Sequence, residues 1–357
     1  MDAGDEIEMS SEPGKGSEPV KASEAGEPFS TPEHTGASSD PLVGTAPAPV
    51  VAPTPAPVEG AVRLGASLDI AAVRIAGGGL RDDARAVAVV WRRELIRFFR
   101  NRLRILTSLA QPVLFLFVLG TGLASMVSAR GGPQGSVLGA GIDFKTFMFP
   151  GVVGMTVLFT AIFSAVSIVW DREFGFLREM LVAPVRRGAI VVGKCVGGAT
   201  VATLQGVLML ALAGLVHVPY SPTLILTLLG EMMLAAFMLT AFGIMLAARI
   251  SQVESFQVVM QFFVLPMFFL SGALFPLSNL PQWLAVLTKV DPLSYAVDPM
   301  RRAVLSQMAL SPRTRAVLGQ GMSWDGWRLP VGLELGLVAL AGVVVLAIAA
   351  RRFARPE

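Results

Sequence analysis

The chain has few of the residues that build cross-links and metal centres. It contains a single cysteine, Cys195, and two histidines, His34 and His217, among its 357 residues. One cysteine excludes an intrachain disulfide and leaves the redox character of the compartment open. Two histidines and one cysteine, far apart in sequence, do not form the spacing of a metal site. The sequence therefore predicts no bound metal.

Charged residues are also scarce, at 15% of the chain, whereas 53% of the residues are hydrophobic. A typical soluble domain is about 25% charged. The charges are unevenly placed, because residues 1–60 hold 11 acidic and 2 basic residues, while residues 61–357 hold 15 acidic and 27 basic ones. The basic residues of the second part lie at the ends of apolar runs, which is typical of membrane topology. We therefore expect no nucleic-acid partner.

The first 83 residues contain no long apolar run. Pro, Ala, Ser, Gly and Glu dominate residues 1–60, and the stretch 46–57 alternates proline with small residues. Such a segment buries too little apolar surface to offset the entropy of ordering. Its acidic start also lacks the apolar region of a signal peptide. We predict a disordered acidic, proline-rich cytoplasmic tail over 1–83. Its composition favours the role of a spacer over that of a docking motif.

Residues 84–104 have the pattern of an amphipathic helix at a membrane interface. One predicted face carries large apolar residues: Trp91, Leu95, Phe98, Phe99 and Leu103. The other carries arginines: Arg93, Arg97, Arg100 and Arg104. Aromatic residues backed by arginines suit the headgroup boundary of a bilayer. A surface helix on a soluble core is disfavoured, because a long apolar run follows at once.

Six apolar runs follow, each with at most one charged residue. They are 105–126, 146–170, 195–218, 223–248, 255–288 and 329–350. About 20 helical residues cross a hydrocarbon core of about 30 Å, so each run is long enough to span a membrane. The fold class is therefore an all-α polytopic membrane protein with six transmembrane helices, and its transmembrane domain covers 105–355.

The distribution of arginine and lysine gives this topology a direction. Basic residues gather before the first run, in the second and fourth connections and at the C-terminus, which predicts that both termini are cytoplasmic in the inner (plasma) membrane. The fifth connection conflicts with this, since it carries six basic residues: Lys289, Arg301, Arg302, Arg313, Arg315 and Arg328. We interpret Phe275–Val304 as a re-entrant extracellular hairpin of short helices before the last span, which would place these charges outside.

One motif imitates a nucleotide-binding loop. Gly188 to Lys194 matches G-x-x-x-x-G-K, but the next residue is Cys195, where the loop needs Ser or Thr to bind Mg²⁺. The segment also opens an apolar run instead of following a buried strand. We therefore predict no ATP site in this chain, and we interpret Gly193 and Gly197 as positions where two helices approach closely.

The second connection, 171–194, is unusually apolar for a loop. Phe174, Leu177 and Leu181 share a face if the segment is helical, and Pro184 would end the helix. A short amphipathic helix of this kind either lies on the membrane or docks in the groove of a partner. Composition alone leaves both possibilities open.

Two motifs resemble a known family. The first is Glu173-Phe174-Gly175-Phe176-Leu177-Arg178-Glu179, followed by Pro184 and the pair Gly193-Lys194. The second is LPMFFLSGALFPLSNLP at 265–281, followed by DPLSYAVDPMR at 291–301. Together they resemble ABC-2-type transporter permeases, and more narrowly the daunorubicin/doxorubicin-resistance type of exporter. The resemblance covers about residues 85–355.

The resemblance implies a permease subunit that exports an amphiphilic drug, lipid or glycolipid. The permease would form a homodimer or heterodimer in the lipid membrane. A separate cytoplasmic ABC ATPase would bind ATP and Mg²⁺, so this chain would be no enzyme and would hold no cofactor. Residues 171–184 would form the coupling helix, and 84–104 the elbow helix. The implied coupling residues are Glu173, Phe174, Gly175, Leu177, Arg178, Glu179 and Pro184.

Ionisable groups inside the spans are candidates for the transport path, because burying them in lipid is costly. Glu231 lies within the fourth run, and Gln205 or Gln261 would hydrogen-bond it. Glu334 lies near the outer end of the sixth run, within reach of water. A carboxylate at Glu231 would suit a cationic amphiphile.

Two other functions remain as alternatives. A secondary transporter driven by an ion gradient would use intramembrane charges and commonly shows internal repeats, of which the sequence has no clear sign. An intramembrane enzyme is the weakest case, because no Ser–His pair, metal cluster or paired carboxylate occurs within the runs.

Overall fold

The computed structural model describes residues 79–129, 143–175, 186–277, 280–308, 310, 321–324 and 326–354. All of these belong to the unit Leu68–Glu357. The predicted tail over 1–83 lies outside the described residues except for its last five. Those five include the first turn of a helix.

The described residues form helices and one small hairpin. The helices are α1 (Leu80–Arg100), α2 (Arg102–Leu114), the π-helical turn η1 (Phe115–Leu119), α3 (Gly120–Ala129), α4 (Phe144–Ser164), α5 (Val166–Glu173), α7 (Arg187–Leu210), the 3₁₀ turn η3 (Ala213–Val216), α8 (Pro222–Ala247), α9 (Val253–Leu270), α10 (Gln282–Val290), α11 (Ser294–Ser306) and α13 (Val331–Ala354). Strands β1 (Ser323–Trp324) and β2 (Trp327–Arg328) pair antiparallel between α11 and α13.

Six helical segments in the described residues are long and apolar enough to cross a membrane. They are Arg102–Met126, Phe144–Glu173, Arg187–Leu210, Pro222–Ala247, Val253–Leu270 and Val331–Phe353. The predicted all-α architecture with six spans is therefore confirmed.

Three span boundaries predicted from the sequence are wrong. The fifth span ends at Leu270 instead of 288, because a turn containing Gly272 at a φ of 70° ends the helix there. The third span covers Arg187–Leu210 instead of 195–218, so Lys194 lies two turns inside helix α7.

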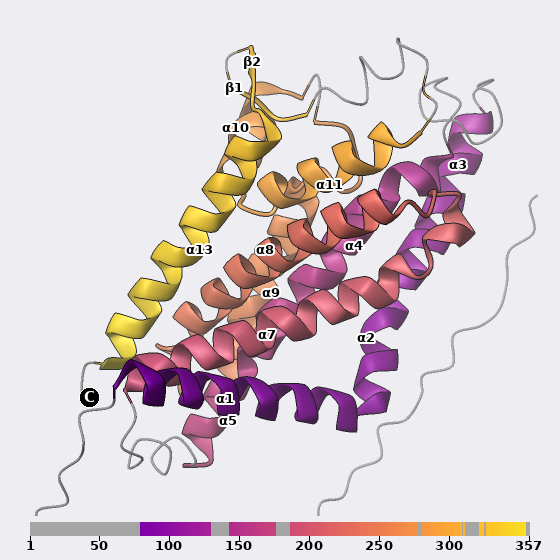
Figure 1. Ribbon diagram of the computed structural model, residues 1–357. Helices are drawn as coiled ribbons and strands as arrows, with labels where there is room; N and C mark the ends of the chain where they lie inside the picture. Colours follow the sequence, from indigo (N-terminus) through magenta and orange to yellow (C-terminus); the bar gives the residue numbers. More distant parts are fainter. Residues whose placement is uncertain are drawn as a thin grey trace, which may run out of the picture. The chain divides into compact units, whose positions relative to one another are not determined.

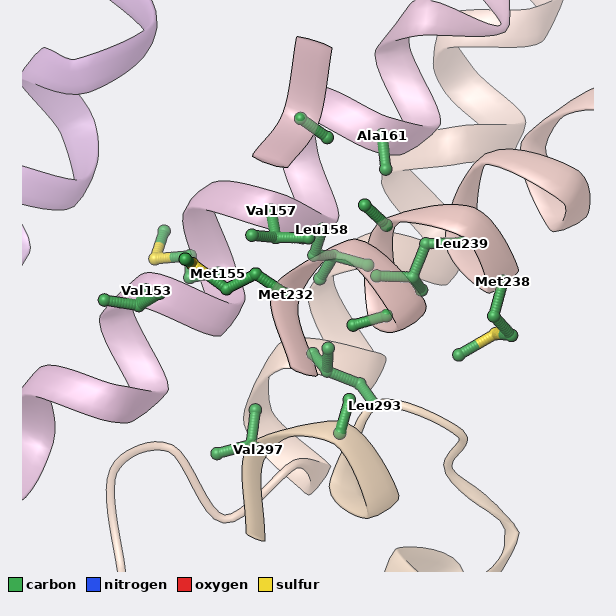
Figure 2. Close-up of a cluster of buried hydrophobic side chains, with 14 of the residues drawn as sticks. Val153, Met155, Val157, Leu158, Ala161, Met232, Met238, Leu239, Leu293 and Val297 are labelled. Carbon is green, nitrogen blue, oxygen red and sulfur yellow. The ribbon is translucent and has the colours of Figure 1, made fainter. Parts of the chain in front are cut away.

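Helix α7 is the centre of the packing. It lies against α1, α4, α8 and α13, and α4 also packs against α8 and α11 (Figure 1). Figure 2 shows the interior of this arrangement, where Val157 from α4 and Leu239 from α8 meet Leu293 and Val297 at the start of α11. Lipid chains are as apolar as these side chains, so burying them between helices adds van der Waals contacts but no hydrophobic free energy. The stability of the bundle therefore depends on how closely the side chains pack.

Helix α1 approaches α7 closely at two glycines. A Cβ at Gly193 would lie 2.8 Å from Val90 Cβ, and one at Gly197 would lie 2.9 Å from Glu94 Cβ. The prediction that these glycines let two helices approach is confirmed, and the partner helix is α1. The nucleotide-binding interpretation also fails on geometry, because Gly188 to Cys195 are helical.

The amphipathic helix is present at a shifted position, Leu80–Arg100 instead of 84–104. Asn101 ends it with a φ of −102° and a ψ of 71°, and the Asn101 side chain accepts a hydrogen bond from the Arg104 backbone N–H at 3.0 Å, which starts α2. Its location at a membrane interface remains a prediction.

Some charged residues of α1 turn toward the protein, whereas the placement of its apolar face at the headgroup boundary stays a prediction. Arg93 and Glu94 are partly covered and take part in ion pairs with α5 and α7. Val89, Ile96 and Phe99 are instead exposed. The ion pairs with buried partners decide this orientation, since an uncompensated buried charge costs more than an exposed apolar side chain.

The segment predicted as a re-entrant hairpin contains two short helices, α10 and α11. Helix α11 packs against α4, α8 and α13, and a Cβ at Gly151 would lie 2.5 Å from Ala273 Cα, so the turn before α10 also contacts α4. Whether these helices enter the bilayer remains a prediction.

Candidate functional site

The last turn of α5 carries three charged residues, Asp171, Arg172 and Glu173, which we call the α5 triplet. They belong to the spanning helical segment that includes α4 and not to the connection that follows, where the sequence pattern placed them. Each member of the triplet contacts a different part of the transmembrane bundle.

Asp171 is the buried member of the triplet, with 3% of its surface exposed. It accepts a hydrogen bond from Lys194 Nζ of α7 at 2.5 Å, and Arg93 Nη2 of α1 donates to its two oxygens at 3.1 and 3.3 Å. Lys194 Nζ also lies 3.1 Å from Ser167 Oγ and 3.5 Å from Glu94 Oε1. A buried charge network of this kind fixes one relative position of α1, α5 and α7.

Arg172 connects α5 to the ends of two other spans. Its Nη1 donates to Ala248 O at 3.1 Å and to Ile250 O at 3.4 Å, after the end of α8. Its guanidinium also lies 5.9 Å from the ring centroid of Phe353 near the end of α13, and Arg187 Nη1 donates to Phe353 O at 3.5 Å. The end of α13 therefore lies beside the end of α5 and the start of α7.

Glu173 connects α5 to α9. Its Oε2 accepts a hydrogen bond at 3.0 Å from the backbone N–H of Val253, the first residue of α9. A carboxylate at this position satisfies one of the free N–H groups of the helix and interacts favourably with the helix dipole.

Helix α5 ends at the two residues that follow the triplet. Phe174 is exposed, and Gly175 has a φ of 80°, a conformation that ends helices and that glycine adopts without strain. The periodicity predicts one helix that contains both Phe174 and Leu177. The positive φ of Gly175 excludes an uninterrupted helix through these positions. The predicted coupling residues Leu177, Arg178, Glu179 and Pro184 lie outside the described residues.

No hydrogen bond in the described part of the chain joins the three residues predicted for a transport path. Gln205 is fully buried on α7, and its Nε2 donates to Ile105 O at 3.2 Å and to Ser108 Oγ at 2.9 Å, so its amide is used by α2. Gln261 is on an exposed face of α9. Glu231 is 4% exposed on α8, and among the described residues its Oε2 has no hydrogen-bond partner. The expected pairing of Glu231 with either glutamine is therefore wrong.

A cavity of about 870 Å³ lies between the α1–α2 junction, α4, α5 and α7. Its α2 wall is formed by Leu103, Arg104, Thr107, Ser108, Gln111 and Pro112, of which Arg104, Thr107, Ser108 and Gln111 form a polar stripe. The sequence analysis missed this stripe, although the spacing i, i+3, i+4 and i+7 was visible, because the run after Arg104 contains no charge. Gln205 contacts the cavity wall through Ser108 and does not itself line it.

A second charge cluster lies at the opposite end of α13. Arg302 is hydrogen-bonded to Asp298 and pairs with Glu334 Oε1 at 2.9 Å, and Asp298 accepts a hydrogen bond from Met322 N at 3.0 Å. Glu334 is fully buried, which corrects the expectation that it reaches water. The cluster fixes α11 against α13 and against the start of the β-hairpin.

Two groups outside the spans have altered pKa values because of burial. Arg301 lies 4.6 Å from the ring centroid of Phe147 and is hydrogen-bonded to Gly272 O, and desolvation lowers its pKa to about 10. Asp291 accepts hydrogen bonds from the backbone N–H groups of Leu293 and Ser294, yet desolvation outweighs them and raises its pKa to about 7.

The six apolar helices define the class of protein as a multi-pass membrane protein. Residues 85–305 match the sequence model described as "ABC-2 type transporter". The chain therefore belongs to this family. This confirms the resemblance to ABC-2-type transporter permeases, while the narrower daunorubicin/doxorubicin-resistance type stays a prediction.

Curated relatives agree with this class. The chain is 31% identical to nodulation protein J of Rhizobium leguminosarum bv. trifolii over 222 residues, covering 60% of this chain and 80% of that protein. It is 29% identical to the probable multidrug ABC transporter permease YbhR of Escherichia coli K12 over 171 residues, covering 47% of this chain and 46% of YbhR. The matched part thus spans about half the length of YbhR.

Proposed function

We propose that the chain is the transmembrane subunit of an ATP-driven ABC exporter whose ATP is hydrolysed by a separate cytoplasmic ABC subunit. Family membership supports the permease role. The α5 triplet is the observation that carries the proposal, because it connects the end of α5, where the segment 174–185 begins, to five other helices. The permease itself holds no ATP or Mg²⁺, which the partner subunit binds.

Coupling follows from the contacts of the triplet. A displacement of the segment 174–185 by a bound ATPase would move the end of α5. Asp171 would carry that displacement to α1 and α7, Arg172 to the ends of α8 and α13, and Glu173 to the start of α9. Buried ion pairs and hydrogen bonds have discrete geometries, so they transmit a displacement as a change of state and not as a gradual deformation.

The proposed orientation puts both chain ends in the cytoplasm of a cell with this permease in its inner membrane. Arg93, Arg172, Arg187 and Lys194 lie at the end of the bundle where α13 also ends, and short basic segments mark the cytoplasmic side. The re-entrant hairpin α10–α11 then lies on the outer side.

A dimer and an amphiphilic cargo complete the proposal. Helix α9 exposes an apolar stripe formed by Val258, Phe262, Leu265 and Phe269, which lipid or a second permease copy can cover. The cargo is a drug, lipid or glycolipid. The name of YbhR, a probable multidrug permease, and the resemblance to the daunorubicin-resistance type favour a drug.

Substitution of Glu179 tests the coupling role. We expect Glu179→Lys to abolish both copurification with the cognate ATPase and ATP-dependent efflux of a fluorescent amphiphile from inverted vesicles. Glu254→Lys makes the same charge change at an exposed position in the first turn of α9 and should leave both unchanged. If Glu179→Lys retains ATPase binding and transport at the native level, the proposed coupling role is wrong.

One observation favours the secondary-transporter alternative, namely the buried carboxylate oxygen of Glu231 without a hydrogen-bond partner among the described residues. A proton-driven carrier would need such a group within a span. Transport that persists after ATP depletion while a proton gradient remains, and that Glu231→Gln abolishes, would establish this alternative in place of the ATP-driven exporter.

A further inference from the structure

The cavity between α2 and α4 differs from the lipid-facing surface of a spanning helix. Its volume of about 870 Å³ lies within the range of small-molecule sites. Arg104, Thr107, Ser108 and Gln111 fall on one side of α2 and all line it. Thr107 and Ser108 donate their hydroxyl groups to Leu103 O and Ile105 O of the same helix, at 3.0 Å each. The polar groups of this wall that a ligand would meet are therefore the side chains of Arg104 and Gln111, which a face covered only by acyl chains would not need.

The opposite wall is mixed. Phe159 and Phe163 of α4 are stacked, with ring centroids 6.2 Å apart and planes inclined by 17°. Thr160 and Ser164 lie beside them on the same helix, and Trp170 lies at the end nearer the α5 triplet. The rings offer a flat apolar surface along the cavity, and the hydroxyl groups offer hydrogen bonds.

Charge at one end of the cavity is positive. Arg97 and Arg104 line it together with a single carboxylate, Glu94. That carboxylate is already compensated, because Lys194 Nζ lies 3.5 Å from its Oε1 and Arg97 Nη1 lies 3.8 Å from its Oε2. In the part of the chain that the structure describes, Arg104 forms no ion pair, so its guanidinium is available to an anion.

We propose that this cavity binds an amphiphile with an anionic head group. Arg97 and Arg104 bind the head group, since guanidinium groups form paired, charge-assisted hydrogen bonds with phosphate or carboxylate. The apolar part lies along Phe159 and Phe163. The location of the head group at the inner leaflet rests on the proposed orientation of the permease. This preference for an anionic head group is opposite to the cationic cargo that a carboxylate at Glu231 would suit. Glu231 does not line the cavity.

Trp170 provides a direct probe, because it lines the cavity and is 46% exposed. The other four tryptophans are replaced by phenylalanine: Trp91, Trp283, Trp324 and Trp327. The purified permease is placed in nanodiscs that contain phosphatidylglycerol or phosphatidylcholine with identical brominated chains, and quenching of Trp170 is titrated. We expect about tenfold stronger apparent binding of phosphatidylglycerol, because the choline cation of phosphatidylcholine offsets the attraction between its phosphate and the two guanidinium groups.

The matched variants separate this site from general attraction to the membrane. Arg97→Gln with Arg104→Gln should remove the preference for phosphatidylglycerol. Arg100→Gln with Arg102→Gln removes the same charge from the same junction, at residues that do not line the cavity, and should retain the preference. Equal quenching by the two lipids, or a preference that survives in Arg97→Gln/Arg104→Gln, would overturn the proposal.

A second measurement covers the case in which the tryptophan-depleted protein does not fold. The thermal unfolding of the permease with all its tryptophans is compared in the two lipids for the same pair of double variants. Added stability in phosphatidylglycerol should disappear only in Arg97→Gln/Arg104→Gln, and an undiminished effect there would contradict the site.

The source of the amphiphile is decided separately, with decyl phosphate added to the permease–ATPase complex. Competition with phosphatidylglycerol together with stimulated ATP hydrolysis would identify a transported amphiphile, and competition without stimulation would identify a resident lipid. Both outcomes support the site, while absence of competition would contradict it. Because lipid binding is measured on the permease alone, failure of the exporter proposal would leave this result intact.

Discussion

At the scale of single residues, the environment predicted for Lys194 differs most from the environment found in the structure. The sequence suggests an exposed basic residue at the membrane surface, whereas the structure buries it to 5% exposure against Asp171. Removing one partner of a buried pair leaves an uncompensated charge, while replacing both with neutral groups avoids that cost. This asymmetry distinguishes a structural ion pair from a solvated one.

We predict that Lys194→Met destabilises the detergent-solubilised permease by about 3 kcal/mol, the usual cost of breaking a buried pair. Asp171→Asn combined with Lys194→Met should cost less than the sum of the two single changes, because the charges of both partners of this pair are removed together, while Arg93 and Glu94 keep theirs. Thermal unfolding of the four proteins of this cycle measures the coupling. Additive effects would indicate that the two residues do not interact.

The raised pKa of Asp291 predicts a pH dependence of stability. Since burial raises this pKa from 3.8 to about 7, the folded state binds the proton more tightly than the unfolded state. Its contribution to stability is therefore complete below about pH 4 and is lost as the pH rises to about 7.

Asp291→Asn should remove this dependence, although its single oxygen replaces only one of the two acceptors, Oδ1 for Leu293 N–H and Oδ2 for Ser294 N–H. We expect the unfolding temperature of the variant, relative to that of the native protein, to rise between pH 5 and pH 8. Parallel curves for the two proteins between these values would show that Asp291 does not carry the effect.

At the scale of elements, the contact between α1 and α7 depends on small residues. Apolar periodicity predicts that α1 exists, but only the packing shows that Gly193 and Gly197 lie under it. A Cβ at Gly193 would lie 2.8 Å from Val90 Cβ and 3.1 Å from Val87 O, so the two helices would have to separate.

Gly193→Ala is therefore expected to lower stability by about 1–3 kcal/mol, as overpacking does in other helix contacts. Gly230→Ala is the matched control, because nothing lies within 4 Å of a Cβ at that position in α8. Its unfolding temperature should be unchanged or higher, since alanine is the better helix former. If both variants lose the same stability, the loss in Gly193→Ala does not come from the close contact between α1 and α7.

At the scale of the whole molecule, six spans put the start of α2 and the end of α13 on the same side of the membrane. The β-hairpin and α11 then lie on the other side, which is extracellular in the proposed orientation. The chain suits a test with single cysteines, because Cys195 is its only natural one and is fully buried.

In a Cys195→Ala background we predict that Ser323→Cys reacts with a membrane-impermeant maleimide in intact cells. Arg351→Cys should react only after the cells are opened, since the end of α13 is cytoplasmic. Labelling of Arg351→Cys in intact cells, or protection of Ser323→Cys, would reverse the topology.

Much of this architecture could be predicted from local patterns. Apolar runs predict spans because every buried backbone group in lipid must be satisfied within a helix, and the length of a run limits what it can be. The end of the fifth span at 270 and the start of the third at 187 are less predictable. Turn geometry and the burial of Lys194 depend on neighbours distant in sequence.

The sequence by itself determined the helical class, the six spans and the family. These depend on composition along short segments and on motifs such as Glu173-Phe174-Gly175. Only the tertiary structure decided which polar groups meet. It pairs Asp171 with Lys194 and Arg302 with Glu334, leaves Glu231 Oε2 without a hydrogen bond among the described residues, and places Arg104 on a cavity. The physical reason is that a charge in a low-dielectric interior is stable only beside a partner, and partners far apart in sequence become neighbours only when the helices pack.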